Sequence, residues 1–378
     1  MSTLGSAAFY GCSGFTGDLV IPENVIDLQN YAFKGCSGFN GVLKIPNSLT
    51  TIYDRTFEGC CGLTGDLVIP NTITSIGEYA FYDCYGFTGE LKLPNSITEI
   101  NRAAFKQCSG FSGELKLPNS ITRIGIDAFY KCSGFTGDLI IPNSVTSIAS
   151  SAFYACSGMN GTLVLPDSIT VINSHVFSGS GFTGDLIIPN NVTAIKEYAF
   201  INCSSFDGNL ILPEGLTSID QYAFYKCSGF TGELKFPKSM TYIGSNAFYS
   251  CSGFTSFKSE NSTPPTASSN SFSKVSTTAP LYVPVGTKSD YAYATGWNVF
   301  KNNIIEDATT DIEAIEEHIN VIVNNGTIIV NGSDEDVYVE VYGINGQCLY
   351  RGNDKIIPIE LKGLFLVKIN GSMFKVSL

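Results

Sequence analysis

The 378-residue sequence has little of what catalytic and metal sites are built from. It contains two histidines, His175 and His318, one tryptophan, and charged residues amount to 15% of the chain. Two histidines so far apart do not readily make a catalytic triad or a zinc site, and His175 fits an ordinary substitution at a repeat position. We therefore expect no enzymatic activity, no cofactor and no metal site.

Phosphate-binding and membrane-spanning motifs are missing as well. The sequence has no P-loop. Its one G-x-G-x-x-G, at residues 179–184, precedes a predicted strand, whereas in nucleotide-binding proteins this motif follows a strand. No apolar run is long enough to be a membrane span. The net charge of −12 argues against nucleic acid and anionic membranes as partners. The first residues lack the basic and apolar regions of an export signal and enter a repeat midway, so we expect such a signal to have been removed.

The sequence is rich in repeats. A phenylalanine recurs at a constant interval that is one position shorter only between Phe177 and Phe200, and a proline keeps the same period. The phenylalanines are Phe9, Phe33, Phe57, Phe81, Phe105, Phe129, Phe153, Phe177, Phe200, Phe224 and Phe248. This period of about 24 residues, with apolar residues at fixed offsets, is typical of a solenoid in which each coil contributes a strand. We predict such a solenoid for residues 1–255.

One coil, residues 60–83, shows the predicted pattern. The segment 65–70 alternates polar and apolar residues before proline, which predicts a short strand stacked in parallel on its equivalents about 4.8 Å away, ten strands to a sheet. Residues 71–76 form a second extended segment, and residues 77–82 a helical or 3₁₀ turn. The residues predicted to point inward are Leu67, Ile69, Ile73, Ile76, Ala80 and Phe81.

Ten of the twelve cysteines occupy one column of the repeat: Cys12, Cys36, Cys60, Cys84, Cys108, Cys132, Cys156, Cys203, Cys227 and Cys251. Equivalent positions on adjacent coils have parallel side-chain directions, which is a poor geometry for a disulfide. We predict a ladder of small buried side chains. Cys61 and Cys348 lie outside this ladder.

The amino-acid sequence of the repeat resembles a known family. IPNSVTSI at residues 141–148 and AFYKCSGFTG at residues 128–137 are similar to the BspA-like leucine-rich repeats of bacterial surface proteins. The resemblance covers residues 5–255. It implies a leucine-rich-repeat solenoid, an extracellular or outer-membrane-associated location, and binding to other proteins.

Two further segments follow the repeats. Residues 256–310 are predicted to cap the solenoid, with a strand at 281–283 and a short helix around 290–294, because an uncovered end exposes core and strand edges. Residues 311–378 alternate apolar strands with Asn-Gly turns at 325–326, 331–332, 345–346 and 370–371, which predicts a small antiparallel β-sandwich. The segments VYVEVYGINGQCLYRG at residues 337–352 and GLFLVKINGSMFKV at residues 363–376 are similar to the C-terminal β-sandwich tails that sort Bacteroidetes proteins to the cell surface.

Charged residues stand on the predicted outer face of the first sheet. The residue before the Leu67-type position is acidic in seven of ten coils, and two residues further on lies a lysine or an aliphatic residue. Lys92, Lys116 and Lys235 are predicted to neutralise the glutamates of their own coils. The acidic candidates for binding are Asp66, Asp138, Asp185, Glu90, Glu114 and Glu233. This face either keeps the protein soluble or binds a basic or cation-bridged partner.

Tyrosines form a second stripe beside the core phenylalanines. The candidates here are Tyr82, Tyr130, Tyr154 and Tyr225. Their flat rings and hydroxyls suit contact with glycans or proteins, and they equally suit packing between coils.

These patterns favour a non-enzymatic surface protein. We expect a monomer that binds a host or bacterial surface protein or extracellular matrix through many weak contacts along one face. The alternative is a glycan-binding module that uses the tyrosines.

Overall fold

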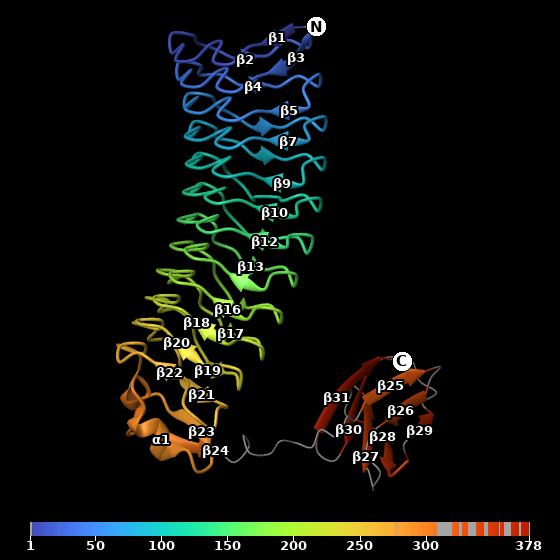
Figure 1. The fold of residues 1–378 in the computed structure, drawn as a ribbon. Helices are drawn as coiled ribbons and strands as arrows, with labels where there is room; N and C mark the ends of the chain where they lie inside the picture. The colour runs from blue at the N-terminus through green and yellow to red at the C-terminus, as the bar shows by residue number, and fades with distance from the viewer. Residues whose placement is uncertain are drawn as a thin grey trace. The chain divides into compact units, whose positions relative to one another are not determined.

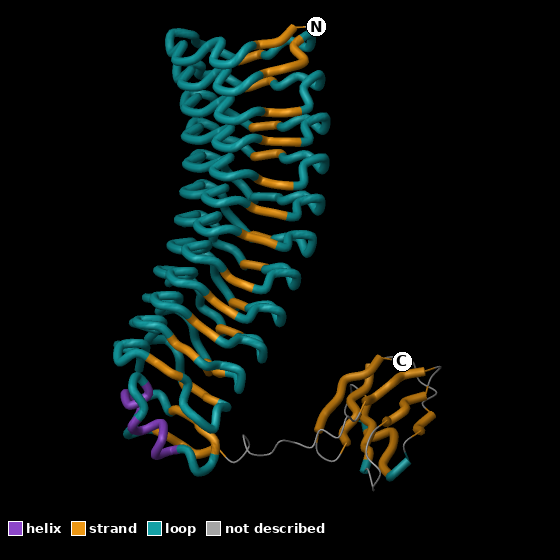
Figure 2. Tube along the Cα trace, in the orientation of Figure 1, coloured by secondary structure: helices purple, strands orange, loops and turns teal. Residues whose placement is uncertain are grey.

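The structure is a computed structural model that describes residues 2–276, 278–307, 320–324, 327–331, 338–343, 347–354, 356–358, 364–369 and 372–377. Contacts divide the chain into two units, Met1–Asp307 and Ala308–Leu378. The first unit is a solenoid of stacked coils (Figure 1), and most of each coil is turn rather than regular structure (Figure 2). This confirms the predicted solenoid.

The first ladder of strands comes from the segment before the repeat proline. Its members are β2 (Leu19–Val20), β4 (Leu43–Lys44), β6 (Leu67–Val68), β8 (Leu91–Lys92), β11 (Leu139–Ile140), β13 (Leu163–Val164), β15 (Leu186–Ile187), β17 (Leu210–Ile211), β19 (Glu233–Phe236), β21 (Ser256–Ser259), β23 (Leu281–Pro284) and β24 (Ile304–Asp307). They pair in parallel, as predicted, at an offset of one repeat, so that Leu67 faces Leu91. However, β2 to β17 pair only two by two, and the coil of Leu115 has no strand there, so the prediction of one continuous ten-strand sheet is wrong.

The second extended segment forms a ladder of its own. Its strands are β1 (Ser2–Leu4), β3 (Val25–Leu28), β5 (Thr51–Ile52), β7 (Ser75–Ile76), β9 (Glu99–Ile100), β10 (Arg123–Ile124), β12 (Ser147–Ile148), β14 (Val171–Ile172), β16 (Ala194–Ile195), β18 (Ser218–Ile219), β20 (Tyr242–Ile243) and β22 (Thr266–Ala267). All its pairs are parallel, and five strands from β14 to β22 make its longest continuous sheet. Most coils thus have strands in two ladders.

The predicted helical turn takes the form of consecutive hydrogen-bonded turns. In one coil, Ala80, Tyr82 and Cys84 donate their backbone N–H groups to the carbonyl three residues earlier, while Tyr79, Phe81 and Asp83 donate to the next coil. This alternation places Tyr79 (φ 55°) and Asp83 (φ 60°) in the left-handed region. Side chains other than glycine rarely adopt it, so stacking between coils overrides local preference here.

The core lies inside the coils, in columns that run along the solenoid. The six residues predicted to point inward are buried, and Phe81 and Phe105 stack with ring centroids 5.5 Å apart at an interplanar angle of 2°. Nine of the ten ladder cysteines are buried, as predicted, and Cys12 is half-buried in the first coil. The Sγ of Cys108 donates to the carbonyl of Phe81 at 3.0 Å, and Ser180 makes the same bond to Phe153 where the cysteine is replaced.

The C-terminal end of the solenoid carries the predicted strand and helix. β23 extends the first ladder beyond β21, and α1 (Lys288–Tyr293) begins two residues earlier than expected. The 3₁₀ helix η1 (Trp297–Phe300) follows, and Trp297 is fully buried with its Nε1 donating to the Pro265 carbonyl at 2.8 Å. The predicted cap segment therefore contributes both sheet and core.

The second unit contains two antiparallel sheets. One has β25 (Asn320–Asn324), β26 (Thr327–Asn331) and β29 (Ile356–Pro358); the other has β27 (Val339–Gly343), β28 (Cys348–Gly352), β30 (Leu364–Ile369) and β31 (Ser372–Ser377). Buried side chains such as Ile328 and Val341 come from both sheets. The predicted Asn-Gly turns lie wholly or partly outside the described residues.

Candidate functional site

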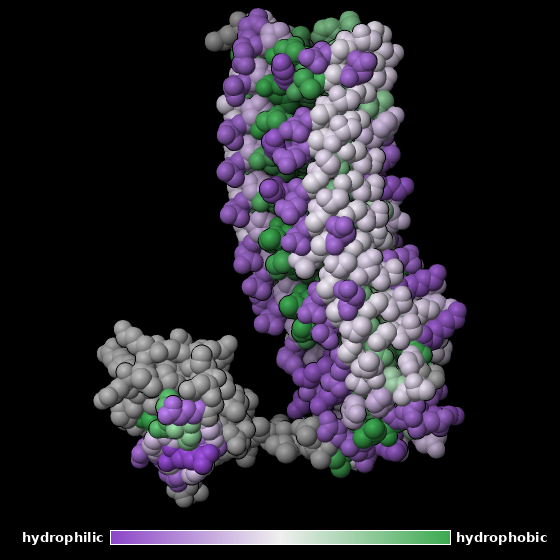
Figure 3. Space-filling model, turned by 180° about the vertical axis from the view of Figure 1, so that it is seen from behind, coloured by the Kyte–Doolittle hydropathy of each residue, from purple (hydrophilic) through white to green (hydrophobic). Residues whose placement is uncertain are grey.

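The face of the first ladder carries two exposed columns. We call the residues before the ladder leucines the acidic column: Asp18, Val42, Asp66, Glu90, Glu114, Asp138, Thr162, Asp185, Asn209 and Glu233. We call the residues after those leucines the central column: Val20, Lys44, Val68, Lys92, Lys116, Ile140, Val164, Ile187, Ile211 and Lys235. Every residue of the central column is exposed, because the strand alternates and its leucine faces the core. Figure 3 shows hydrophobic side chains gathered in a band between hydrophilic columns along one face of the solenoid.

The aspartates of the acidic column hold neighbouring coils together. The Oδ1 atom of Asp138 accepts the backbone N–H of Thr162 in the next coil at 2.7 Å. In return, the N–H of Gly137 donates to Oδ1 of Asn160 at 2.9 Å. We call this reciprocal pair of bonds the aspartate clamp. Asp18, Asp66 and Asp185 accept in the same way from Val42, Glu90 and Asn209.

From β2 to β17, the clamp occurs wherever two strands of the first ladder pair. The four aspartates belong to the coils of β2, β6, β11 and β15, and each pairs with the coil that follows. In the coil of Leu115 the equivalent residue is Glu114, whose side chain is exposed. No hydrogen bond or ion pair of this side chain is found among the described residues. This coil has no strand in the first ladder. Sequence reasoning missed this role, although Gly-Asp opens every clamped pair and could have been the signal.

Of the three lysines predicted to pair within their own coil, only Lys92 does so, and it lies closer to an aspartate of the preceding coil. Lys92 Nζ lies 2.6 Å from Asp66 Oδ2 in the preceding coil and 3.6 Å from Glu90 in its own, and the bond from Lys92 lowers the pKa of Asp66. Lys235 binds Glu214 and Glu260, each at 3.0 Å. No ion pair joins Lys116 to Glu114 or Lys235 to Glu233 in the described part of the chain. The prediction that these coils neutralise themselves is wrong for Lys235, because its long side chain reaches glutamates of the neighbouring coils. It is also wrong for Lys116, for which no ion pair is found among the described residues.

The predicted acidic candidates therefore differ in availability. Asp66 is neutralised by Lys92. Glu233 accepts a hydrogen bond of 3.3 Å from Ser256 in the next coil. Asp138 and Asp185 form no ion pair with a lysine or arginine among the described residues, so their charge remains exposed to a partner.

The four tyrosine candidates are half-buried, and the ring of each packs against another tyrosine ring. Tyr130 and Tyr154 stack at 4.6 Å, Tyr225 and Tyr249 at 4.7 Å, and Tyr82 meets the edge of a neighbouring tyrosine at 5.9 Å. Lys106 lies 4.4 Å from the centre of the Tyr130 ring. His175 continues the stack 4.6 Å from Tyr198, and its burial lowers the pKa of the imidazole. Neighbouring rings thus occupy much of the aromatic surface that a ligand would need.

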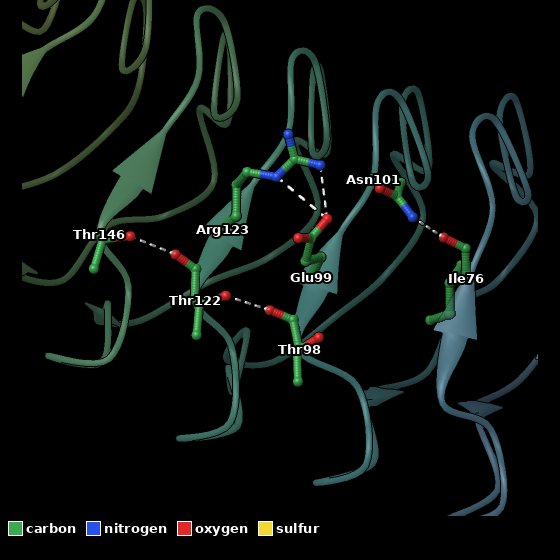
Figure 4. Close-up of polar contacts among 7 residues, drawn as sticks. All are labelled: Ile76, Thr98, Glu99, Asn101, Thr122, Arg123 and Thr146. Atoms are coloured by element: carbon green, nitrogen blue, oxygen red, sulfur yellow. Dashed lines mark hydrogen bonds and ion pairs between the residues drawn. The ribbon is translucent and has the colours of Figure 1, made fainter.

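The second ladder carries a row of threonines that stabilises the stack. Thr122 Oγ1 donates to the Thr98 carbonyl at 3.2 Å, and Thr146 Oγ1 to the Thr122 carbonyl at 3.3 Å (Figure 4). Beside this row, Arg123 binds Glu99 at 2.6 Å. These polar groups are satisfied within the protein, so the row is a structural feature.

The described residues contain no group of three His, Cys, Asp or Glu side chains placed to hold a metal ion. Within that part of the chain, no helix has the length and apolar character to cross a membrane. A cavity of about 470 Å³ lies in the first two coils, lined by Phe9, Phe15, Leu19 and other apolar residues. Among the described residues that line it, Asp18 is the one titratable side chain.

Two stacked ladders of parallel strands, with one short repeat per coil, define a solenoid of the leucine-rich-repeat class. A sequence profile described as BspA type Leucine rich repeat region matches residues 2–319 in overlapping stretches, with six copies. The chain belongs to this BspA-type leucine-rich repeat family, which confirms the resemblance noted in the repeats.

Several solved structures are similar to this chain. A leucine-rich repeat protein from Bacteroides ovatus is 21% identical with a TM-score of 0.50, covering 81% of this chain and 86% of that one. A leucine rich cell surface protein from Faecalibacterium prausnitzii is 23% identical with a TM-score of 0.35, covering 64% and 76%. The pneumococcal vaccine antigen PcpA is 16% identical with a TM-score of 0.46, covering 81% and 83%. The comparison with curated proteins gave no match.

Proposed function

We propose that the protein is a non-enzymatic surface protein that binds other proteins, or mediates cell adhesion, through the face of its first ladder. The observation that carries the proposal is the combination of exposed aliphatic side chains and unpaired carboxylates on that face, centred on Ile140, Asp138 and Asp185. Exposed apolar side chains gathered beside charges are typical of interaction sites. Membership of a family of bacterial surface repeats supports the same role.

The binding mode is multivalent. Each coil presents the same two columns, so a partner with its own repeated groups makes several weak contacts at once. The partner is a host or bacterial surface protein or a component of extracellular matrix, and the protein itself acts as a monomer. It resides outside the cell or at the outer membrane, and the segment of residues 311–378 serves as a sorting signal, an anchor or a structural domain.

An array of matrix proteins and glycans, probed with the purified chain, tests the proposal. Asp66→Asn, Asp138→Asn and Asp185→Asn are made together, because asparagine keeps the Oδ1 acceptor of the clamp and removes the charge. We expect the wild-type chain to bind protein spots in a salt-sensitive way and the triple variant to bind several-fold more weakly.

The control removes charge elsewhere. The control variant is Asp54→Asn with Glu78→Gln. Both residues lie in the turns that follow the second ladder, where Asp54 Oδ1 accepts the Glu78 N–H at 2.8 Å. This variant should bind like wild type. Binding only to glycan spots, insensitive to salt and abolished by Tyr130→Ala with Tyr225→Ala, would contradict the proposal in favour of the glycan alternative.

A further inference from the structure

The central column changes character along the solenoid. In the N-terminal coils lysines interrupt the aliphatic residues, but Ile140, Val164, Ile187 and Ile211 follow one another without interruption. Their side chains are 60%, 46%, 57% and 45% exposed. We call these four residues the aliphatic strip. At about 4.8 Å per coil the strip is roughly 14 Å long, and lysines close it at both ends.

The same stretch of chain is acidic. Residues 132–225 contain seven Asp and Glu residues and a single lysine, Lys196, which lies 3.4 Å from Asp220. Beside the strip, both hydrogen bonds to Asp138 from Thr162 end on Oδ1, and so do both bonds to Asp185 from Asn209. The Oδ2 atoms of these aspartates therefore remain available, two coils apart. A partner for the strip should be apolar along one line and cationic beside it.

We propose that the aliphatic strip binds a basic amphipathic α-helix of a partner protein. This inference rests on the proposed function and names the chemistry of the partner. Apolar residues one turn apart on a helix are separated by about 5.4 Å along its axis, so three turns, or roughly 16 Å, match the four coils. Lysines and arginines on the flanks of that helix then reach Oδ2 of Asp138 and Asp185.

Other occupants fit less well. Side chains on one face of an extended strand are about 6.8 Å apart, so such a strand loses register with the coils after one step. Anionic lipid headgroups are repelled by the acidic surroundings. A second copy of this chain is also acidic, with a net charge of −12, and its helix α1 is not basic. Charge and spacing together favour the cationic helix.

The test measures binding of a short fluorescent Leu/Lys peptide, with leucines at positions 1, 5, 8 and 12, to the full chain by fluorescence anisotropy. Two control peptides replace all leucines by glutamine or all lysines by glutamate. We expect the Leu/Lys peptide alone to bind and to become helical in circular dichroism. Equal binding of either control peptide, or binding without helix formation, would overturn the inference.

Matched variants locate the site. Ile140→Ser with Ile187→Ser should weaken peptide binding about tenfold or more, because two exposed anchors are lost. The double variant Val20→Ser, Val68→Ser changes the central column outside the aliphatic strip and should leave peptide binding unchanged. The double variant Asp138→Asn, Asp185→Asn should weaken peptide binding several-fold and reduce the salt dependence of that binding. Equal weakening by both serine pairs would overturn the inference.

The two proposals fail separately. If array spots that bind wild type also bind the Ile140→Ser, Ile187→Ser variant with unchanged strength, the proposed function stands and the helix site is wrong. If the array shows no protein partner and the peptide still binds at the strip, the helix site stands as a peptide-binding surface and the proposed adhesion role is wrong.

Discussion

At the scale of single residues, the same side chains serve structure and surface. Asp138 uses one carboxylate oxygen in the aspartate clamp and leaves the other facing solvent. Position within the coil placed this residue correctly on the outer face. Its bond to the next coil was not predicted, because it depends on which atoms of two successive coils meet.

The buried thiols are the other residue-scale feature. Each Sγ of the nine buried ladder cysteines donates to a phenylalanine carbonyl of the preceding coil, for instance Cys156 to Phe129 at 3.1 Å. Burial raises the pKa of all nine, to about 12 for Cys156 and Cys203. The fold therefore holds these groups as neutral thiols.

This burial makes the protein sensitive to alkali. Unfolded cysteines lose their protons near a pH of about 8.5, whereas the folded ladder keeps them. The stabilising contribution is fully present below that pH and is lost as the pH rises, at about 1.4 kcal/mol per pH unit for each thiol. We expect the urea midpoint, measured with reductant, to fall steeply between pH 8 and pH 9.5.

A conservative substitution checks the cause. Cys108→Ser should reduce the pH dependence of the unfolding free energy by the contribution of one titrating proton. The fold should be kept, since Ser180 already makes the equivalent bond at 3.0 Å. A midpoint that does not move between pH 8 and pH 9.5 would show that the thiols do not titrate on unfolding.

At the scale of elements, the coil is shaped by its neighbours. Residues such as Tyr79 adopt positive φ although their type disfavours it, because alternate N–H groups in this turn bond to the next coil. The prediction of a helical turn from a short Ala-Phe segment was close in position and less accurate in form. Local conformational propensity is a poor guide to this turn, because every second backbone N–H in it donates to the next coil.

Glycines of one column let the coils approach closely. A Cβ on Gly86 would lie 2.2 Å from the Cys61 carbonyl oxygen and 2.6 Å from that of Leu63. Gly86→Ala should lower the free energy of unfolding by about 1–3 kcal/mol, because the backbone contact cannot yield. Chemical denaturation measures the loss.

Gly14 is the matched control. It occupies the same column in the first coil, where a Cβ would meet nothing within 4 Å. Gly14→Ala should change stability by less than about 0.5 kcal/mol. Similar losses in both variants would mean that backbone conformation, rather than stacking, makes glycine necessary at this column.

At the scale of the whole molecule, a solenoid is a chain of nearest-neighbour contacts, so its ends decide much of its stability. The C-terminal end is closed by Trp297, whose ring meets Phe272 at 4.9 Å and Tyr291 at 5.2 Å. The position of this closing segment was predicted from the break in the repeat. The burial of its tryptophan was not.

Trp297→Ala should cost about 3–5 kcal/mol, because it removes a fully buried ring and a hydrogen bond. Hydrogen exchange should rise first in residues 233–307 and reach the N-terminal coils last. Tyr293→Ala is the control, since that side chain is 89% exposed. Uniform loss of protection along the solenoid would contradict the nearest-neighbour description.

The period of the repeat, the inward columns and the family followed from the amino-acid order alone, because stacking near-identical coils repeats every apolar position along one line. The spatial arrangement decided the rest. The aspartate clamp, the lysine bonds between coils and the free oxygens beside the aliphatic strip all depend on atoms that lie one repeat apart in the chain. Which of those atoms meet is set by the register of one coil on the next, and a single coil's sequence does not contain that register.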